Sequence, residues 1–361
     1  MKGRRICFVG WADHVHLERW AGYFAVQGYE VSVVSFSGTG RYPAGVRQYR
    51  VGLEGRGPRW VQLRLRWLFW RIRPEVVHVH WAHFASDVCV AWRGPLMVTA
   101  WGSDIYRRDR FSDRQWAALD QAMHRAGLVT CDSDDLARTI RETFELPESA
   151  VEVIQWGVDI KLFSPNGVDQ RQTLGLTGRE VVFSVRNFTP LYNQETVLAA
   201  FAALRERRPG VFLLMKSYGG DPQYLALIRS DIERRGLTHD VRILDAVPYE
   251  QMPALYRTAD VTVSIPLSDA TPMSLFEAMA SGSPCVVCDL PSLREWVRDG
   301  ETGYLANATD VQGVAEALHR ALEKGSRRES LQRAARELVI ARASQRAHME
   351  VAAQRYERLC Q

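Results

Sequence analysis

The sequence contains no apolar run long enough to cross a membrane. A membrane helix needs about 20 consecutive apolar residues, whereas the longest apolar stretches, such as 6–9 and 284–287, have the length of a strand. The start, MKGRRICFVGW, is basic and then apolar like a secretory signal, but Asp13 and further charged residues follow it. We interpret it as a first strand, and we expect a cytoplasmic protein that does not span a bilayer.

Cysteine is scarce, and the sequence shows no complete metal-binding pattern. The six cysteines are scattered, which agrees with a reducing compartment. Cys285 and Cys288 have C-x-x-C spacing, but side chains three apart on a strand point to opposite faces, and no second pair follows. In HVHWAH, His78 and His80 share one strand face and His83 lies nearby, without a further ligand at a defined spacing. We therefore expect no metal site.

The sequence also has no internal repeat, no low-complexity tract and no strongly basic region. Hydrophobic residues make up 46% and charged residues 24%, as in ordinary globular proteins, and 361 residues suit two domains. Residues 1–165 carry 22 Lys and Arg against 18 Asp and Glu, which accounts for the whole net charge of +4. Because this excess is far smaller than a nucleic-acid-binding surface carries, we expect no nucleic-acid partner.

What the sequence does contain is an alternation of strand-like and helical patterns. The first strands are predicted at 5–9 and 31–36, with a helix at 16–27 between them that ends at Gly28. Further strands are predicted at 76–80, 96–100, 128–131 and 151–154, then at 180–185, 211–216, 241–244, 261–264 and 284–287. This βαβ order predicts an α/β protein with parallel sheets covered on both faces.

The alternation stops at 159–176, a stretch with Pro, Gly and Asn but no apolar period. We place the domain linker there and predict two doubly wound domains, 1–165 and 166–340, with a helical segment at 341–361. Ligands of such sheets bind beyond the carboxyl ends of the strands. The loop after the first strand has one glycine instead of G-x-G-x-x-G, which argues against dinucleotide binding.

The most informative stretch is SIPLSDATPMSLFEAMASGSPCVV, residues 264–287. The loop holds Asp269, and a helix is predicted to start close to Met273 and to end at a glycine. Amides at a helix start attract anions, so a pyrophosphate is expected there. Glu277, one turn inside the helix, is suited to accept two ribose hydroxyls, and Asp269 to contact a sugar. The helix-start residues are Thr271, Pro272, Met273 and Ser274. The pattern indicates a nucleotide-sugar site.

This stretch resembles the signature of retaining glycosyltransferases of family 4, in which an acidic residue, seven others and a Glu precede AMA-x-G-x-P. Segments 153–165, 184–201 and 291–305 are similar to the same family, in the expected order. The resemblance covers nearly the whole chain. It implies the GT-B fold, two Rossmann-like domains that face a cleft, with the last helix, 341–361, crossing back to the first domain.

On the donor side the chain departs from the family at two positions. The first acidic residue of the signature is Asp269 where relatives usually have Glu, so the side chain is one methylene shorter. The family's Arg over the pyrophosphate matches Arg186, but its Lys falls on Tyr192 or Asn193. Lys216, at the end of the next strand, is the candidate for the missing charge, and a surface or salt-bridged lysine is the alternative.

The first domain is expected to choose the acceptor, because the nucleotide motifs occupy the second. Where many relatives have His, VTAWGSDIY has Trp101, whose indole cannot act as a base. Trp101 is suited either to core packing or to stacking on a sugar ring, and Asp104 to accepting hydroxyl protons. Asp13, His14 and His16, in the 10–20 loop, are the other acceptor-side candidates, with a helix cap as the alternative for the histidines.

The segment RGPRWVQLRLRWLFWRIRP, residues 56–74, combines six arginines with three tryptophans. A basic, aromatic amphipathic helix is suited to peripheral contact with an anionic membrane, here the inner face of the cell membrane. A helix that covers a sheet must bury an apolar face in any case, and arginines are common on its outer side. We favour the packing interpretation and keep membrane contact as the alternative.

Together these features predict a retaining, metal-independent transferase that moves a sugar from a nucleoside diphosphate to an acceptor hydroxyl, in glycan, glycolipid or glycoconjugate biosynthesis. The acceptor is expected to be a sugar, a lipid-linked molecule or a small molecule, and no cofactor is expected. Arg186, Asp269 and Glu277 are the predicted catalytic residues. A nucleotide-sugar epimerase on the same fold and an inactive nucleotide-sugar-binding subunit are the alternatives.

Overall fold

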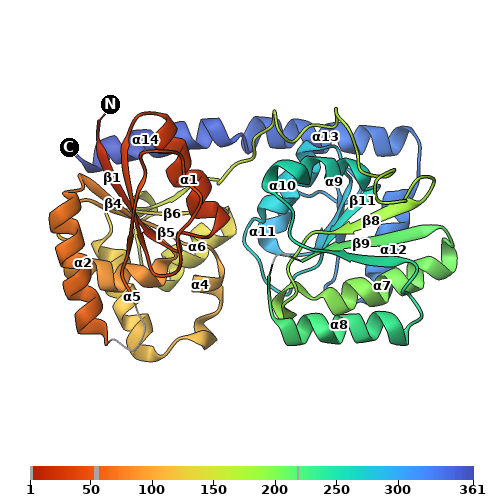
Figure 1. The fold of residues 1–361 in the computed structure, drawn as a ribbon, viewed down its shortest axis with the longest axis horizontal. Helices are drawn as coiled ribbons and strands as arrows, with labels where there is room; N and C mark the ends of the chain where they lie inside the picture. The colour runs from red at the N-terminus through yellow and green to blue at the C-terminus, as the bar shows by residue number, and fades with distance from the viewer. Residues whose placement is uncertain (1–2, 53–56, 218) are drawn as a thin grey trace. The chain divides into compact units, whose positions relative to one another are not determined.

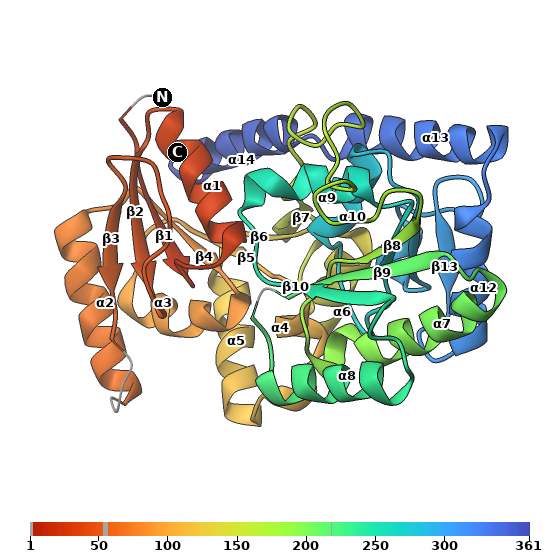
Figure 2. The same cartoon turned by 45° about the vertical axis from the view of Figure 1, so that its right-hand side comes forward.

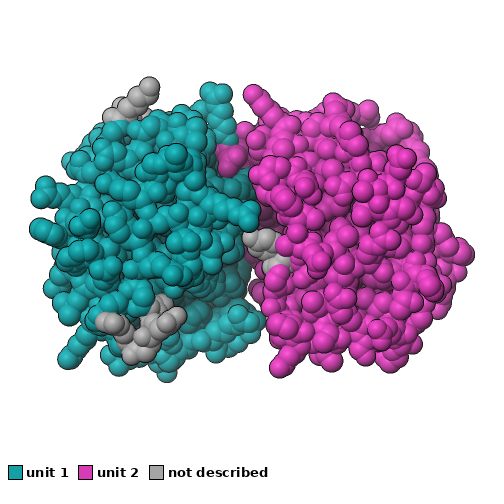
Figure 3. Space-filling model, in the orientation of Figure 1, with its two compact units in different colours: residues 1–156, 346–361 teal, residues 157–345 magenta. Residues whose placement is uncertain are grey.

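A computed structural model describes residues 3–52, 57–217 and 219–361 of the chain. The chain forms two compact units (Figure 3): unit 1 comprises Met1–Trp156 and Arg346–Gln361, and unit 2 comprises Gly157–Gln345. Unit 2 therefore begins earlier in the sequence than the predicted boundary at 165/166. The reason is that Phe163 is buried against Tyr249 and Tyr256 of unit 2, and Val158 pairs with Ser344.

Unit 1 contains a sheet of seven parallel strands in the order β3-β2-β1-β4-β5-β6-β7. The strands are β1 (Arg5–Gly10), β2 (Glu30–Ser35), β3 (Arg47–Arg50), β4 (Val76–His80), β5 (Leu96–Thr99), β6 (Leu128–Cys131) and β7 (Val151–Val153). The sequence predicted all of these except β3. That strand lies at the edge of the sheet with polar, mostly exposed side chains, so it carries no apolar pattern.

The helices of unit 1 cover both faces of this sheet (Figure 1). They are α1 (Val15–Val26), α2 (Pro58–Ile72), α3 (Ala85–Ala91), α4 (Ser103–Tyr106), α5 (Asp113–Arg125), α6 (Asp134–Thr143) and α14 (Gln345–Leu359). The C-terminal α14 packs on α1 and β4 through Tyr356, whose buried hydroxyl accepts from the Trp20 indole at 2.8 Å and lies 2.6 Å from His78 Nδ1. None of the described helices is long and apolar enough to cross a membrane.

Unit 2 contains a sheet of six parallel strands in the order β10-β9-β8-β11-β12-β13. The strands are β8 (Glu180–Ser184), β9 (Val211–Lys216), β10 (Val241–Leu244), β11 (Val261–Ser264), β12 (Cys285–Cys288) and β13 (Tyr304–Ala306). The sequence predicted these strands except the short β13 at the edge. Cys285 and Cys288 are buried on β12 and are free thiols.

Helices also cover both faces of the second sheet (Figure 2). They are α7 (Gln194–Arg207), α8 (Pro222–Arg234), α9 (Met252–Thr258), α10 (Met273–Ala280), α11 (Pro291–Arg294), α12 (Val311–Leu322) and α13 (Ser326–Arg342). Helices α7, α8 and α12 lie on one face, and α9 and α10 on the other. Because all strands of each sheet are parallel, the loops that follow them gather at one edge of each unit.

Candidate functional site

The loop between β11 and α10 in unit 2 has the features of an anion-binding site. Helix α10 begins at Met273 after Pro272, as the sequence predicted, and no side chain caps its first amides. Its first turn also contains no acidic residue. Thr271, immediately before it, is 3% exposed, and its Oγ1 has no hydrogen-bond partner among the described residues. The first amides of α10 and the Thr271 hydroxyl are therefore hydrogen-bond donors that can bind a phosphate.

Arg186 brings a buried positive charge to this helix start. It follows β8, its Nη1 donates to Ser274 Oγ at 3.4 Å, and its guanidinium lies over the Tyr192 ring at 4.1 Å. Nη2 forms an ion pair with Asp269 Oδ2 at 2.7 Å. Burial opposes the charge of Arg186, but Asp269 and Tyr192 outweigh it, so the pKa of Arg186 is raised. The guanidinium therefore stays charged at every physiological pH.

Asp269 is held against Arg186 from several directions. Burial raises the pKa of this carboxyl, while Arg186 and the amide of Ala270 lower it, and the net shift is upward. The Ser292 hydroxyl donates to the Asp269 carbonyl at 2.9 Å and fixes the loop. The structure thus joins two predicted catalytic residues, Arg186 and Asp269, in one ion pair.

Glu277 and Lys216 form a second charged group in unit 2. Glu277 is almost completely buried, and its Oε2 accepts from the Tyr256 hydroxyl at 2.9 Å. Lys216 ends β9 and is 8% exposed. Burial lowers the pKa of Lys216, and the nearby Glu277 carboxylate opposes that shift. Lys216 is therefore a buried lysine beside Glu277, as opposed to a surface lysine.

Two residues that support this site were not predicted from the sequence. Tyr256, on α9, is fully buried and donates to Glu277. Gln194, at the start of α7, donates through Nε2 to the Arg186 carbonyl at 2.7 Å and accepts from Ser184 at 2.8 Å. Tyr256 has no local signal, because it lies 21 residues from Glu277 on another helix. Gln194 lies only eight residues from Arg186, so the short spacing from the end of β8 to the start of α7 is the nearest hint that the sequence contains.

The acceptor-side candidates lie in unit 1, after β1 and β5. His14 caps α1 by accepting from the His16 amide, and its ring lies 4.4 Å from that of Trp101. Asp13 accepts from the Ser37 hydroxyl. Trp101 is partly exposed, so it is not a core residue. Asp104 is fully buried and its two oxygens accept the Trp101 and Ala82 amides, so this carboxylate holds loops together and is not presented to solvent.

The histidines of HVHWAH serve packing roles. His78 bonds to Tyr356 and Thr99 through its two ring nitrogens, and burial lowers its pKa to about 3. His83 stacks on Phe111 with ring centroids 3.5 Å apart. Within the described ranges no group of three or more His, Cys, Asp or Glu side chains is arranged to hold a metal ion.

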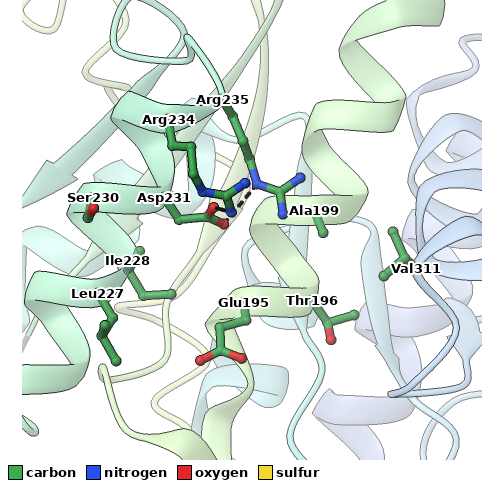
Figure 4. A pocket seen from close by; sticks show the side chains of 10 residues that line it. All are labelled: Glu195, Thr196, Ala199, Leu227, Ile228, Ser230, Asp231, Arg234, Arg235 and Val311. Carbon is green, nitrogen blue, oxygen red and sulfur yellow. Dashed lines mark hydrogen bonds and ion pairs between the residues drawn. The ribbon is translucent and has the colours of Figure 1, made fainter.

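Unit 2 also has a pocket of about 490 Å³ between α7 and α8, shown in Figure 4. Its lining includes none of the predicted donor residues. The Asp231 carboxylate at its centre is paired with Arg234 and Arg235, and Figure 4 shows both guanidinium groups turned toward it. The charges of this pocket neutralise one another, so we assign it no part in the site.

Two family models match the chain, one in each half. Residues 14–162 match the model described as Glycosyltransferase Family 4, and residues 168–338 match the model described as Glycosyl transferases group 1. The two matches follow one another along the chain. The first lies on unit 1 except for residues 157–162, which belong to unit 2, and the second lies on unit 2.

Curated relatives carry the same kind of description. A D-inositol 3-phosphate glycosyltransferase of Nocardiopsis dassonvillei is 29% identical over 226 residues, which are 60% of this chain and 53% of that protein. The protein of the same name from Nocardia farcinica is 30% identical over 205 residues, 55% of this chain and 45% of that protein. The chain thus spans about half the length of these two relatives.

Solved structures of similar fold cover the whole chain. Sucrose-phosphate synthase from Thermosynechococcus elongatus has a TM-score of 0.87 at 18% identity, over 99% of both chains. Anabaena HepE, solved in complex with UDP and glucose, has a TM-score of 0.83 at 18% identity, over 98% of this chain and 99% of that one. At such low identity the likeness shows the fold alone.

Proposed function

We propose, on the premise that this chain belongs to the glycosyltransferases of family 4, that it transfers a sugar from a nucleoside diphosphate to an acceptor hydroxyl with retention of anomeric configuration. The observation that carries the proposal is the uncapped start of α10 beside the buried, charged Arg186 and the unpartnered Thr271 hydroxyl. These groups suit a diphosphate, because helix-start amides and a guanidinium both stabilise phosphate oxygens. The family membership supplies the reaction class.

Each part of the donor is assigned to a group of side chains. Arg186 and the residues Thr271 to Ser274 bind the diphosphate, with Lys216 as a further positive charge. Glu277 accepts the ribose hydroxyls on the carboxylate that Tyr256 already positions. Asp269 orients the transferred sugar. The Arg186–Asp269 ion pair then couples diphosphate binding to the placement of the sugar-binding carboxylate.

During transfer, negative charge develops on the departing diphosphate. Arg186 and the α10 amides stabilise that charge from fixed positions, so no reorganisation is needed as the bond breaks. None of the donor-side carboxylates is free to act as a general base, since Asp269 pairs with Arg186 and Glu277 with Tyr256. We propose that the leaving phosphate oxygen takes the acceptor proton on the same face of the sugar, which retains the anomeric configuration.

The direct test is a panel of nucleoside diphosphate sugars with sugar, lipid-linked and small-molecule acceptors. HepE was solved with UDP, so UDP-sugars are the first donors to test. We expect a glycoside product with the anomeric configuration of the donor, read by NMR. A new sugar from donor alone would identify an epimerase, and tight binding without turnover would identify an inactive subunit. An inverted product would contradict the retaining mechanism.

We expect excess EDTA to leave turnover unchanged. The reason is that Arg186 neutralises the diphosphate, and the nearby carboxylates Asp269 and Glu277 are each engaged by a protein donor instead of forming a pair for Mg²⁺. Turnover is measured with and without EDTA after dialysis against the chelator. Reversible loss of activity that added Mg²⁺ restores would contradict the metal-free mechanism.

We further propose that α2 attaches the enzyme peripherally to the inner, anionic face of the cell membrane. The helix buries Val61, Leu65, Leu68, Phe69 and Ile72 against its unit, so the packing interpretation holds for one face. The outer face, however, exposes Leu63, Trp67 and Trp70, and Arg64 and Arg71 lie over the Trp67 ring. Exposed indoles flanked by arginines suit the boundary between headgroups and acyl chains. Arg56, at the start of the predicted segment, lies outside the described residues.

Co-sedimentation with vesicles tests this attachment. We expect binding to vesicles that contain phosphatidylglycerol, little binding to pure phosphatidylcholine, and about ten-fold weaker binding after Trp67→Ala with Trp70→Ala. Leu227→Ala, which removes an exposed apolar side chain from α8 in unit 2, is the matched control. Equal binding of the double variant and the control would contradict the assignment to α2.

A further inference from the structure

A cluster of aromatic rings lies at the carboxyl ends of β1, β4 and β5 in unit 1. We call it the tryptophan cluster; its members are Trp11, His14, His16, Trp81, Trp101 and Trp156. Trp101 lies at its centre, with ring centroids 5.8 Å from Trp11 and 6.1 Å from Trp81. Trp11, Trp81 and Trp101 are each partly exposed. Three indoles from three different loops thus share one partly open site.

The backbone of this cluster is held in an unfavourable conformation. Trp81 has φ 77 and ψ 101, a region that bulky residues rarely adopt. Such conformations persist only where surrounding contacts enforce them, and they concentrate at functional sites. Here Asp104 supplies the contacts, since its two oxygens accept the amides of Ala82, which follows Trp81, and of Trp101 at 2.7 and 2.9 Å. One buried carboxylate therefore positions two of the three indoles.

The cluster contains an unsatisfied donor. The Trp101 Nε1 atom is buried and has no hydrogen-bond partner in the described part of the chain. His80 is fully buried, and its ring lies 6.3 Å from the Trp101 ring. Neither of its ring nitrogens has a hydrogen-bond partner in the described part of the chain. Leaving buried polar atoms unpaired is costly, so a cluster with several of them gains from a ligand that presents hydroxyl groups.

The cluster has little positive charge to offer. Burial lowers the pKa of His14 to about 4, against a smaller opposing effect of Asp13, so the ring is neutral at pH 7. Two arginines of the neighbouring loop are engaged elsewhere: Arg107 pairs with Asp109, and Arg108 pairs with Asp113. Two charged groups beside the rings, Asp13 next to His14 and the buried Asp104 next to Trp101, are carboxylates.

The start of α1 does not compensate for this lack of positive charge. The His14 side chain already accepts from the His16 amide, which is one of the first-turn donors. Glu18 also places a carboxylate in the first turn, where it opposes an incoming anion. A phosphate group would therefore meet carboxylates and neutral rings in place of the cations that normally bind it.

We propose that the tryptophan cluster binds the acceptor through an uncharged sugar ring and disfavours phosphorylated acceptors. The proposal rests on the proposed function and specifies the acceptor class. Indole faces suit the C–H face of a sugar, and the Trp101 Nε1 donor suits one of its hydroxyls. The inositol-phosphate specificity in the names of the curated relatives is thus not expected in this chain. Asp104 acts as a positioning residue for Trp81 and Trp101.

The test measures acceptor binding without a donor. Ligand-observed NMR titrations compare methyl glycosides of glucose, galactose, mannose and N-acetylglucosamine with the corresponding sugar 6-phosphates and with inositol 3-phosphate. We expect at least one neutral glycoside to bind, its phosphate to bind about ten-fold more weakly, and Trp101→Ala to weaken the neutral glycoside about ten-fold. Val90→Ala, which shortens an exposed apolar side chain of α3 outside the cluster, is the control and should leave the glycoside affinity unchanged.

Two further variants test the same proposal if Trp101→Ala does not fold. Trp11→Ala, which removes a more peripheral indole, should weaken the same glycoside. Asp104→Asn can accept from only one of the two amides on its single carbonyl oxygen, so it should raise the KM for acceptor while the KM for donor and kcat stay unchanged. A purely structural role would instead lower kcat together with the melting temperature, without a selective rise in the KM for acceptor.

Two results would overturn the inference: a phosphorylated sugar that binds as tightly as its neutral counterpart, or a folded Trp101→Ala or Trp11→Ala variant with unchanged affinity for the neutral glycoside. Absence of binding by every neutral glycoside would also overturn it. Failure of the proposed function would look different, because glycosides would still bind unit 1 while no nucleoside diphosphate sugar was turned over.

Discussion

Replacing Arg186 by Ala is expected to lower kcat by about 100- to 1000-fold, because it removes the fixed positive charge that stabilises the departing diphosphate. The variant also leaves the partly buried Asp269 without its ion-pair partner, so a loss of stability accompanies the loss of activity. Steady-state kinetics and thermal unfolding, measured on the same preparation, separate the two effects.

Arg328→Ala is the matched control for this experiment. Arg328 is another partly buried arginine of unit 2, paired with Asp260 through a side chain 15% exposed, and it lies outside the candidate site. It should lose stability while kcat stays within a few-fold of the original. If Arg186→Ala and Arg328→Ala reduced kcat equally, the effect would come from destabilisation, and the leaving-group role of Arg186 would be wrong.

Asp269→Asn separates the proposed role of Asp269, contact with the transferred sugar, from that of Arg186, stabilisation of the diphosphate. Its contact is assigned to the transferred sugar, so turnover should fall while the affinity for the nucleoside diphosphate changes little. A large loss of diphosphate affinity with turnover preserved would mean that the assignments of Asp269 and Glu277 are reversed.

Replacing Glu277 by Ala is expected to weaken binding of a nucleoside diphosphate by about 3 kcal/mol, or roughly 100-fold. This is the free energy of one to two charge-assisted hydrogen bonds to the ribose. From the sequence alone, Glu277 is expected to bind hydroxyls and not to pack, which predicts that this variant keeps its fold. The structure adds a cost, because the Tyr256 hydroxyl and the buried Lys216 lose the carboxylate they face, and we expect about 1–3 kcal/mol of lost stability.

Two further variants separate the loss of nucleotide affinity from the loss of stability. Tyr256→Phe removes the hydroxyl but keeps the carboxylate, so it should lower stability with little change in nucleotide affinity. Glu277→Gln keeps the shape and removes the charge, and it should lose affinity with less loss of stability. Affinity is measured by calorimetry with the nucleoside diphosphate alone. A folded Glu277→Ala variant with unchanged affinity would show that the ribose is bound elsewhere.

Local sequence patterns were sufficient to predict most of the fold. The apolar runs and the turn residues between them predicted both parallel sheets, and Pro272 followed by a helix-forming segment predicted the start of α10 at Met273. Such features depend on neighbours a few residues apart, so a single sequence contains them. The edge strands β3 and β13 were missed because an edge strand can be short or polar, with no apolar period to detect.

The order of the motifs along the chain also predicted which unit holds the donor groups. Arg186 and Asp269 follow β8 and β11, Lys216 ends β9, and Glu277 lies one turn inside α10. A parallel topology brings these positions to one edge of the second sheet. The sequence by itself therefore determined the fold class, and it predicted the set of donor-side residues. It also predicted the reaction class, through the family signature that those residues form.

Only the tertiary structure decided what each side chain contacts. Asp269 pairs with Arg186, Tyr256 positions Glu277, and Asp104 lies beneath two tryptophan loops where a solvent-facing hydroxyl acceptor was expected. These pairs join elements far apart in the sequence, and no periodicity links their positions. They depend on how helices and loops pack over the sheet edges, where burial and the need to satisfy each polar group select one partner from many.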